Sequence, residues 1–390
     1  MALSVLISAG EASGDLYAAR LVAALKVRFP DAEFFGCAGA RMQSEGVEPV
    51  VDTSRLAVVG LLEVLLHIPR IYGEYRKLCR AIAVRHPGAA ILTDSPDFHL
   101  RVARFIKKLP GRPIPVIYLV APQAWAWRKG RLPQMRRVID RLLCIFPFEE
   151  EFFRRHGIAT TYIGHPLAGL VAPSMSRTQF LSHYALPPGV PLIALLPGSR
   201  GGEAIRHLPA LLDAVRYIRE TRQASFVLGL PPGFDAGKAF SSYFWERIRA
   251  ASIQVTEGET WEILAHADVA LAASGTVTME GALLGTPMVT FYRVTALSWL
   301  LGKLLVRVPF YSMVNLVAGR KVVPELMQNE MSGQRLASEA LRLLNDMDGR
   351  AAMQRDLAEI TRRLSGKKDA TEVAADEVEK VLEKETVHAS

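Results

Sequence analysis

Short apolar runs alternate with amphipathic stretches along most of the chain, and this alternation constrains the fold more than any other feature. Runs that are apolar throughout belong to strands covered on both faces, and strands that alternate with helices form a parallel sheet. In the first half, strands are predicted at Ala2–Ser8, Glu33–Cys37, Ala89–Thr93, Pro115–Leu119 and Arg141–Ile145, and helices at Asp15–Phe29, Leu62–Arg85 and His99–Lys108.

The pattern fades at Gly164–Ser176, which is rich in Gly, Pro and Ser, and then restarts. Strands are predicted at Pro191–Leu196, Phe226–Leu230, Ile253–Val255, Val269–Ala272 and Met288–Phe291, and helices at Glu203–Thr221, Ala236–Ala251 and Thr276–Leu284. The chain is therefore predicted to be an α/β protein of two doubly wound, Rossmann-like lobes. We expect an N-terminal lobe at 1–170, a C-terminal lobe at 171–345, and C-terminal helices at 346–390 that brace the N-terminal lobe.

Length and composition agree with two packed domains. The chain has 390 residues, more than one hydrophobic core usually serves, and 50% of them are hydrophobic. The formal net charge of +8 favours anionic partners without choosing among nucleic acid, phospholipid and phosphorylated substrates. We expect a cytoplasmic protein, because the cysteines are scattered, no basic flank precedes the apolar start, and no run of roughly 20 apolar residues is present.

Ligands of open parallel sheets bind at the carboxyl ends of the strands, so the residues directly after each strand matter most. Gly10-Glu11-Ala12-Ser13-Gly14-Asp15 follows the first strand. Its glycines let the backbone approach a ligand, and a helix start offers N–H groups. A plain turn capped by Ser13 or Asp15 explains the same residues equally well. The stretch has neither the dinucleotide fingerprint nor a P-loop lysine.

Two carboxylates, Asp94 and Asp97, follow the strand Ala89–Thr93 on either side of Ser95-Pro96. A carboxylate at this place can act as a general base for a hydroxyl group, or it can cap the following helix. Both roles can be filled at once, one by each residue.

Arg200 lies among small residues after the strand at Pro191–Leu196, next to Gly198 and Ser199. An arginine and backbone N–H groups at a helix start suit a diphosphate. A glycine-rich turn with a solvated arginine is the plainer alternative.

Ser274, Gly275 and Thr276 follow the strand Val269–Ala272 and can meet a phosphate at the next helix start. Glu280 comes one turn later, where a carboxylate can accept hydrogen bonds from ribose hydroxyls. An ordinary surface position near a helix cap is the alternative for Glu280.

Two stretches, Leu56–Ile68 and Ala296–Phe310, are more apolar than a core helix requires. Together with a tryptophan and basic residues they fit peripheral contact with a membrane surface, and core packing explains them nearly as well. The side chains predicted to touch the membrane are Leu62, Leu65, Leu66, Trp299, Leu300 and Leu304.

The run Trp125-Ala126-Trp127-Arg128-Lys129 resembles a stacking patch for nucleic acid, but its place after Gln123 and a strand favours lining a cleft. We therefore expect no nucleic-acid partner. The histidines lack metal-ligand spacing, and His165 in Gly164-His165-Pro166 is expected to be structural. Neither a metal nor an organic cofactor is predicted.

Taken together, the motifs resemble those of the lipid-A-disaccharide synthase family, in order from about residue 5 to 330. The shared elements are Gly-Glu-x-Ser-Gly-Asp at 10–15, Pro-Asp-Phe at 96–98, Pro-Gln-x-Trp-Ala-Trp at 122–127, Gly-His-Pro at 164–166, Leu-Pro-Gly-Ser-Arg at 196–200, Ser-Gly-Thr at 274–276 with Glu280, Asn-Leu-x-Ala-Gly-Arg at 315–320, and Pro324-Glu325 with Gln328. Two positions depart from the pattern: Ser95 replaces a common Ala, and His99 replaces a common Asn.

The resemblance implies a GT-B-type fold with an active-site cleft between the lobes and an inverting glycosyl transfer. The donor would be UDP-2,3-diacylglucosamine, and the acceptor would be the 6-hydroxyl of 2,3-diacylglucosamine 1-phosphate (lipid X). Asp97 is implied as the general base. Residues implied to bind UDP are Gly198, Ser199, Arg200, Ser274, Gly275, Thr276, Glu280, Asn315, Glu325 and Gln328; residues implied to contact substrate or line the cleft are Gly10, Glu11, Ser13, Gly14, Asp15, Gln123 and Trp125.

Acylated substrates also imply work at the membrane, as a peripheral protein on the cytoplasmic face of the inner membrane of a Gram-negative bacterium. The sequence leaves the oligomeric state open, with a homodimer as one alternative. Arg128, Lys129 and Arg131 are candidates for holding the acceptor phosphate. Two rivals remain: another two-lobed UDP-sugar enzyme, such as a UDP-N-acetylglucosamine 2-epimerase or the peptidoglycan glucosaminyltransferase, and a non-catalytic peripheral lipid-binding protein.

Overall fold

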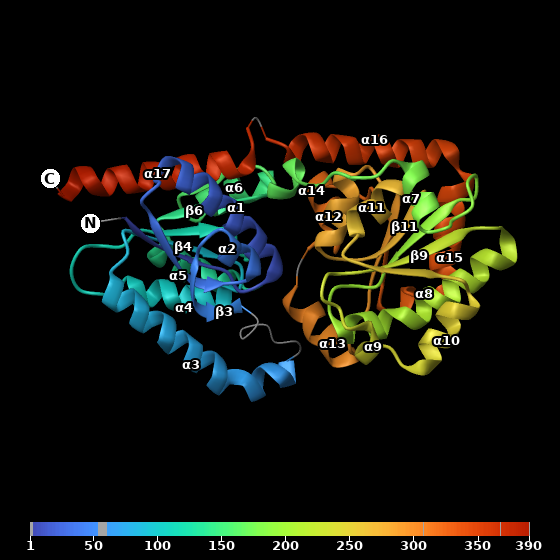
Figure 1. Ribbon diagram of the computed structural model, residues 1–390, viewed down its shortest axis with the longest axis horizontal. Helices are drawn as coiled ribbons and strands as arrows, with labels where there is room; N and C mark the ends of the chain where they lie inside the picture. Colours follow the sequence, from blue (N-terminus) through green and yellow to red (C-terminus); the bar gives the residue numbers. More distant parts are fainter. Residues whose placement is uncertain (1–2, 54–60, 307, 367, 390) are drawn as a thin grey trace. The chain divides into compact units, whose positions relative to one another are not determined.

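The computed structural model describes residues 3–53, 61–306, 308–366 and 368–389, with side chains except those of 61–67, 297, 301, 303–305 and 384–389. The chain divides into two compact units (Figure 1). Unit 1 consists of Met1–Gly169 and Leu364–Ser390, and unit 2 of Leu170–Arg363. Each unit is built on one parallel sheet, so the predicted pair of Rossmann-like α/β lobes is confirmed.

The sheet of unit 1 has, among the described residues, seven parallel strands in the order β3-β2-β1-β4-β5-β6-β7. The strands are β1 (Ser4–Ser8), β2 (Glu33–Ala38), β3 (Glu48–Asp52), β4 (Ala89–Thr93), β5 (Val116–Leu119), β6 (Arg141–Cys144) and β7 (Thr160–Tyr162). The order reverses direction between β1 and β4, which pair in register from Val5 with Ala89 to Ser8 with Leu92. Such a reversal opens a crevice at the carboxyl ends of the two strands.

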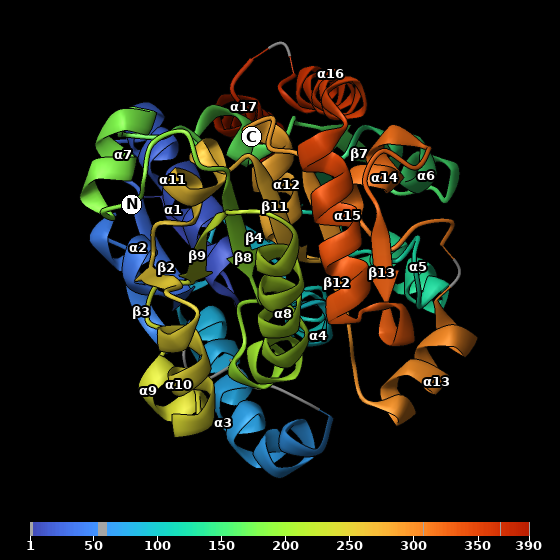
Figure 2. The same ribbon diagram turned by 90° about the vertical axis from the view of Figure 1, so that its right-hand side faces the viewer.

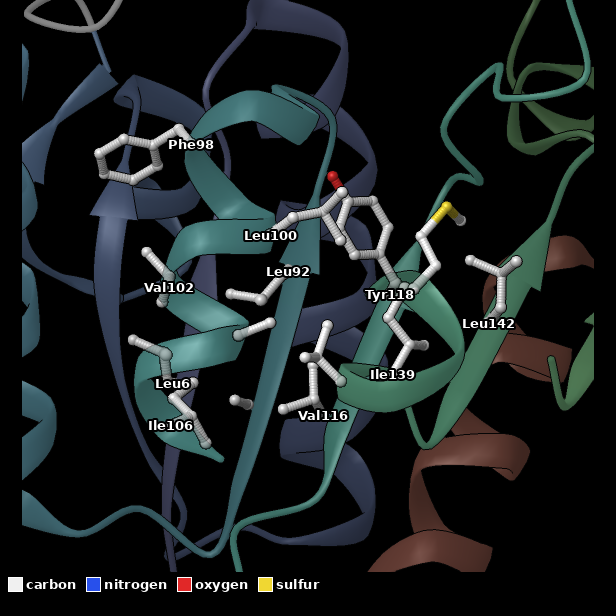
Figure 3. Packing of buried hydrophobic residues seen from close by; sticks show 14 of the residues in the cluster. Leu6, Leu92, Phe98, Leu100, Val102, Ile106, Val116, Tyr118, Ile139 and Leu142 are labelled. Carbon is white, nitrogen blue, oxygen red and sulfur yellow. The ribbon is translucent and has the colours of Figure 1, made fainter. Parts of the chain in front are cut away.

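The helices of unit 1 are α1 (Ala12–Arg28), α2 (Ala40–Ser44), α3 (Leu61–Arg85), α4 (Pro96–Ile106), α5 (Leu132–Val138), α6 (Pro147–Arg155) and α17 (Ala370–Ala389), with short 3-10 turns η2 (Lys129–Arg131) and η3 (Pro166–Gly169). Alternate strand residues such as Leu6, Leu92 and Tyr118 share a buried cluster with apolar residues of α3, α4 and α5. Figure 3 labels Tyr118 of β5 and Leu100 of α4 among the members of this cluster. This packing fixes the start of α4 over the carboxyl end of β4.

The sheet of unit 2 has, within the same described part, six parallel strands in the order β10-β9-β8-β11-β12-β13. The strands are β8 (Leu192–Leu196), β9 (Ser225–Leu230), β10 (Gln254–Glu257), β11 (Val269–Ala273), β12 (Met288–Tyr292) and β13 (Glu325–Met327). Here the order reverses between β8 and β11. The loops after these two strands are therefore the expected ligand loops of unit 2.

The helices of unit 2 are α7 (Arg177–His183), α8 (Gly201–Thr221), α9 (Ala236–Ala239), α10 (Ser242–Ala250), α11 (Thr260–His266), α12 (Thr276–Leu283), α13 (Ala296–Leu305), α14 (Met313–Ala318), α15 (Gly333–Asn345) and α16 (Met347–Leu364), with the 3-10 turn η4 (Gln328–Glu330). α8 and α15 lie side by side in front of the sheet in Figure 2. The expected C-terminal segment at 346–390 is divided, because α16 belongs to unit 2 and α17 to unit 1.

The C-terminal helix α17 packs on α1 within unit 1. Ala374, Ala375 and Val378 of α17 are buried, and Arg28 at the end of α1 forms ion pairs with three carboxylates of α17. A segment more than 300 residues later in the chain thus completes the unit that begins with β1.

Candidate functional site

The end of β4 carries Asp94, whose side chain is only 13% exposed. Its Oδ1 accepts the N–H of Gly10 at 2.7 Å and its Oδ2 accepts the N–H of Glu11 at 3.1 Å. Burial and the nearby Glu11 charge raise the pKa of Asp94 to about 8, against the two N–H bonds. Asp94 therefore fastens the turn after β1 to the end of β4, and its oxygens are already engaged.

The backbone of Asp94 is also held by hydrogen bonds to its carbonyl oxygen. Asp94 and Ser95 both have left-handed backbone angles, with φ of 48° and 34°. The carbonyl of Asp94 accepts the hydroxyl of Tyr118 and the Nδ1–H of His99 at 3.1 Å. The Nε2 of His99 then accepts the Ser8 hydroxyl at 2.8 Å, and burial lowers the pKa of His99 to about 4, so the ring is neutral. A strained turn is thus held in place by buried hydrogen bonds.

Asp97, in the first turn of α4, differs from Asp94 because its side chain is 72% exposed. Arg128 Nη1 donates to both of its oxygens, at 2.9 and 2.8 Å, and Arg131 donates to Oδ1. Partial burial opposes the effect, but the two guanidinium groups hold the pKa of Asp97 below its ordinary value. Of the two carboxylates predicted from the sequence, one caps a turn and the other is open to a ligand.

The turn after β1 is closely packed. A Cβ at Gly14 would lie 1.7 Å from Asp94 Oδ2, so only glycine fits there. Asp15 is buried and accepts the N–H groups of Gly39, Arg41 and Met42, which caps α2. Among the predicted substrate residues of this turn, Glu11 is exposed and Ser13 is partly exposed, whereas Gly10, Gly14 and Asp15 are buried.

Trp125 is half-buried and forms a hydrogen bond with Glu149, a residue that was not predicted from the sequence. The indole N–H donates to Glu149 Oε1 at 2.9 Å, and Glu149 Oε2 accepts the N–H of Phe146. Glu149 is 1% exposed, and burial raises its pKa to about 8. Gln123, from the same motif, is exposed.

In unit 2, the loop after β8 turns sharply at Gly198, where φ is +120°. Glu203 in the first turn of α8 accepts the N–H of Ser199 at 3.1 Å and lies where a Cβ of residue 198 would be. Arg200 is exposed at the N-terminal end of α8. The first N–H groups of a helix lack partners within it, so this end of the 21-residue α8 suits an anion.

The loop after β11 leads through Ser274 and Gly275 to Thr276, the first residue of α12. The Ser274 hydroxyl donates to the carbonyl of Tyr311 at 3.1 Å, and Gly275 and Thr276 are exposed. Glu280 is half-buried, and burial raises its pKa to about 6, against a hydrogen bond with Trp261. Both predicted ligand loops of unit 2 thus follow the two strands at which the order reverses.

Asn315 is fully buried and uses its whole side chain within the fold. Its Nδ2 donates to the carbonyl of Val323 and to Glu325 Oε1, while Oδ1 accepts the N–H groups of Val322 and Val323. Glu325 also accepts the N–H groups of Tyr311 and Ser312, ahead of α14. These two predicted UDP residues connect α14 to β13.

Gln328 has a left-handed φ of 54°, and its Oε1 accepts the N–H of Val294. Its carbonyl accepts the guanidinium of Arg293. The buried His207 joins Arg293 to the carbonyl of Pro197, at 2.7 Å from its Nδ1, and burial lowers the pKa of this histidine. Arg293 and His207 were missed from the sequence, and they tie the ends of β8, β12 and β13 together.

A surface hollow of about 380 Å³ lies at this edge of unit 2, lined by Trp299, Tyr311, Glu325, Met327, Gln328, Asn329 and Glu330. Trp299 lies against Tyr311 with a ring separation of 5.8 Å, while the next residue, Leu300, is 61% exposed. The side chains of Leu62, Leu65, Leu66 and Leu304, and all of residues 56–60, lie outside the described part. Within the described residues, no helix has the length and hydrophobicity needed to cross a membrane, and no three His, Cys, Asp or Glu side chains are grouped to hold a metal.

Comparisons with known proteins decide the family. The family profile described as lipid-A-disaccharide synthetase matches residues 5–378. The lipid-A-disaccharide synthase of Solibacter usitatus is 59% identical over 386 residues, covering 99% of each chain. The chain belongs to the lipid-A-disaccharide synthase family. A Myxococcus xanthus lipid-A-disaccharide synthase, 42% identical over 97% of each chain, agrees.

Membership in the lipid-A-disaccharide synthase family confirms the predicted activity. The chain is an enzyme, a glycosyltransferase of lipid A biosynthesis that transfers a hexosyl group. This result decides against the non-catalytic lipid-binding rival and against the rival sugar enzymes.

Solved structures share the fold at low identity. The UDP-N-acetylglucosamine 2-epimerase of Neisseria meningitidis, solved with UDP-GlcNAc, matches with a TM-score of 0.67 at 12% identity, covering 97% of this chain and 100% of that one. A kitacinnamycin glycosyltransferase matches with a TM-score of 0.62 at 16% identity, covering 97% and 98%. At such identities the likeness shows the two-lobed fold alone.

Proposed function

We propose that Asp97 is the general base of an inverting transfer from UDP-2,3-diacylglucosamine to 2,3-diacylglucosamine 1-phosphate. The acceptor 6-hydroxyl oxygen bonds to the anomeric carbon of the donor while the bond from that carbon to the diphosphate breaks. The hydroxyl proton goes to Asp97, and the electron pair of the broken bond leaves with UDP. The carrying observation is that Asp97 is 72% exposed at the switch point of unit 1, whereas Asp94 is buried and capped.

Unit 2 binds the nucleotide in this proposal. Arg200 and the N-terminal end of α8 stabilise the negative charge that develops on the leaving diphosphate, together with Ser274, Gly275 and Thr276 at α12. Glu280 accepts hydrogen bonds from the ribose hydroxyls. Asn315, Glu325 and Gln328 shape the loops around the hollow that Trp299 and Tyr311 line, and Ser199 and Gly198 form the turn that presents Arg200.

Turnover of the purified enzyme tests the role of Asp97. Asp97→Asn keeps the shape of the side chain but removes its basicity, so the rate of disaccharide formation should fall by about 10³-fold or more, at the upper part of what one acid–base group contributes. UDP affinity and the unfolding midpoint should stay unchanged. Arg155→Gln, which removes a charge from the exposed Arg155–Glu151 pair of α6, is the matched surface control. Substantial turnover by Asp97→Asn would exclude this residue as the base.

Two variants test the nucleotide residues separately. Arg200→Gln should weaken UDP much more than uridine, because only UDP carries the diphosphate. Glu280→Gln should reduce the preference for UDP over its 2′-deoxy form, because the lost interaction is with the ribose. Equal losses for the paired ligands would contradict these assignments.

We further propose peripheral binding to the cytoplasmic face of the inner membrane, through α13 of unit 2 and the start of α3 of unit 1. The support is the acylated nature of both substrates and the exposure of Leu300. Leu300→Gln combined with Leu65→Gln should reduce binding to vesicles of phosphatidylglycerol and phosphatidylethanolamine. Tyr243→Ser, at another exposed apolar position, is the control and should leave binding unchanged.

The oligomeric state is a separate question. Analytical ultracentrifugation at several protein concentrations tests whether the chain forms a homodimer.

A further inference from the structure

The proposed base is held by two cations that are themselves firmly placed. Arg131 is only 14% exposed, and Arg128 lies over the ring of Trp127 with its guanidinium carbon 4.2 Å from the ring centre. Arg128 also has a left-handed backbone with φ of 58°, a conformation rare outside glycine. Strain at an arginine next to the site is typical of a functional position. Arg131 is thus largely buried and Arg128, 44% exposed, is held against Trp127, while the carboxylate of Asp97 is mostly exposed.

This ion pairing is a poor resting state for a general base. A carboxylate that accepts hydrogen bonds from two guanidinium groups is stabilised in its ionised form, and its pKa lies below the ordinary value. Proton transfer from a sugar hydroxyl to such a group is unfavourable, because the driving force falls with the pKa of the base. Some event has to loosen the pairing before Asp97 can work.

The chemistry of the acceptor supplies such an event. In the acceptor sugar, C1 carries the phosphate and C5 carries the hydroxymethyl group, and both carbons are bonded to the ring oxygen. The phosphate and the 6-hydroxyl therefore lie along the same edge of the ring. When the 6-hydroxyl approaches Asp97, the phosphate approaches the groups that contact Asp97, which are Arg128 and Arg131.

A phosphate monoester is a strong competitor for those arginines. It carries up to two negative charges and three acceptor oxygens, and it matches the fork of N–H donors on a guanidinium group. Asp97 carries a single charge and is mostly exposed to water, so its hold on the arginines is the weaker one.

We propose that the acceptor's phosphate monoester binds Arg128 and Arg131 and displaces Asp97 from them, so that the acceptor itself releases the base. This inference rests on the proposed role of Asp97. It assigns the two arginines to substrate specificity, because an acceptor that lacks the phosphate leaves the base paired. Lys129, between them in η2, is exposed and adds charge without contacting Asp97 in the described structure.

Equilibrium binding gives a first test with an unusual sign. With glucosamine 1-phosphate as the probe, Asp97→Asn should bind more tightly than the wild type, by about 10-fold, because the phosphate no longer displaces a charged competitor. Arg131→Gln should bind less tightly by a similar factor, and the surface control Arg155→Gln should be unchanged. Equal or weaker binding by Asp97→Asn overturns the exchange. Glucosamine without phosphate should bind Asp97→Asn and wild type alike.

Kinetics with two acceptors give the second test. Wild type should prefer 2,3-diacylglucosamine 1-phosphate over its dephosphorylated form by about 100-fold in kcat/KM, the discrimination that one lost charge-paired group can produce. In the double variant Arg128→Gln, Arg131→Gln, turnover of the phosphorylated acceptor should fall, whereas turnover of the dephosphorylated acceptor should rise. The acid limb of its pH profile should also move to higher pH, because the pKa of Asp97 is no longer lowered.

The outcomes separate the two proposals. Equal losses of both acceptors in the double variant would mean that the arginines serve the fold alone, and the exchange would be refuted. Retained turnover by Asp97→Asn would instead remove the base assignment, while the phosphate-binding role of the arginines would still be decided by the binding test.

Discussion

The carboxylate of Asp94 accepts the backbone N–H of Gly10 across the switch point of unit 1, at 2.7 Å. This contact joins two motifs that are 84 residues apart in the chain, the glycine-rich first turn and the end of β4, which leads into the first turn of α4 with the exposed Asp97. The turn after β1 thus helps to hold the end of the neighbouring strand β4, and with it the segment that leads to the proposed base. Gly10 and Gly14 belong to a motif that suggests ligand contact, but here they contact Asp94 and stabilise the turn.

The fit of Gly14 against Asp94 leads to a first prediction. In Gly14→Ala the new methyl group would meet Asp94 Oδ2 at 1.7 Å, so the carboxylate has to move and its bonds to Gly10 and Glu11 weaken. Overpacking of this kind costs about 1–3 kcal/mol of unfolding free energy. Activity should fall as well, because the start of α4, which carries Asp97, shifts with Asp94.

Gly73→Ala is the matched control for this variant. Nothing lies within 4 Å of a Cβ at Gly73, inside α3, so alanine should be neutral or stabilise the helix by about 0.5–1 kcal/mol. Urea unfolding of both variants checks the pair. Equal stabilities of Gly14→Ala and wild type would contradict the packing argument.

The buried Glu149 predicts a pH dependence of stability. Its pKa is about 8 in the folded protein because of burial, and lower in the unfolded chain, where the carboxyl is in water. Between these values the folded protein holds a proton that the unfolded chain has lost. The free energy of unfolding therefore falls as pH rises toward 8, by up to about 1.4 kcal/mol per pH unit for one such group. Asp94, with its raised pKa, contributes with the same sign.

Glu149→Gln isolates this contribution. The variant cannot titrate, so its unfolding free energy, measured in urea from pH 5 to 8, should depend less steeply on pH than that of the wild type. Glu220→Gln, in an exposed ion pair with Arg216, should keep the wild-type slope. Trp125 fluorescence should change in Glu149→Gln, because an amide replaces the carboxyl group that accepts the indole N–H. An unchanged slope would show that Glu149 stays ionised in the fold.

Asn315 gives a prediction that separates a structural residue from a ligand contact. Asn315→Ala removes two donated and two accepted hydrogen bonds in a buried place, and it leaves their partners unpaired. The unfolding free energy should drop by about 2–4 kcal/mol. Asn329→Ala, at an exposed neighbour, should change stability little. Loss of UDP binding at full stability would instead show that Asn315 contacts the nucleotide.

Most strands could be predicted from the sequence to within a residue or two, because strands buried on both faces leave uninterrupted apolar runs. The strands that were missed, β3, β7 and β13, lie at the edges of the two sheets. β3 (Glu48–Asp52) contains a proline and two acidic residues, and β7 and β13 have three residues each. The expected helix at Ala236–Ala251 is broken between α9 and α10, where Ser241 begins a new helix.

The sequence did not indicate which residues of the site are open to a ligand and which support the fold. Asp94 and Asp97 have the same chemistry and nearly the same position, and only burial and partners distinguish them. Glu149 had a weak signal, since Pro147 and Glu149 occupy the first and third positions of a helix, as capping residues do. Arg293 and His207 had none, because their bonds join distant segments through backbone atoms.

The contact between α1 and α17 gives the last prediction. Arg28 is 18% exposed and pairs with Glu372, Asp376 and Glu379 of α17 at 2.7 to 2.9 Å. Removing the charge in Arg28→Gln leaves three carboxylates on one face of the helix, where like charges at this spacing repel. We expect α17 to open about 10-fold more often without global unfolding, as seen in faster amide hydrogen exchange over 370–383. Added salt should narrow the difference from wild type, because part of the effect is repulsion between exposed charges.

Arg216→Gln, which breaks an exposed pair on α8, should leave the exchange of α17 unchanged. Wild-type exchange of α17 in Arg28→Gln would mean that apolar contacts such as Val378 hold the helix without help from the ion pairs.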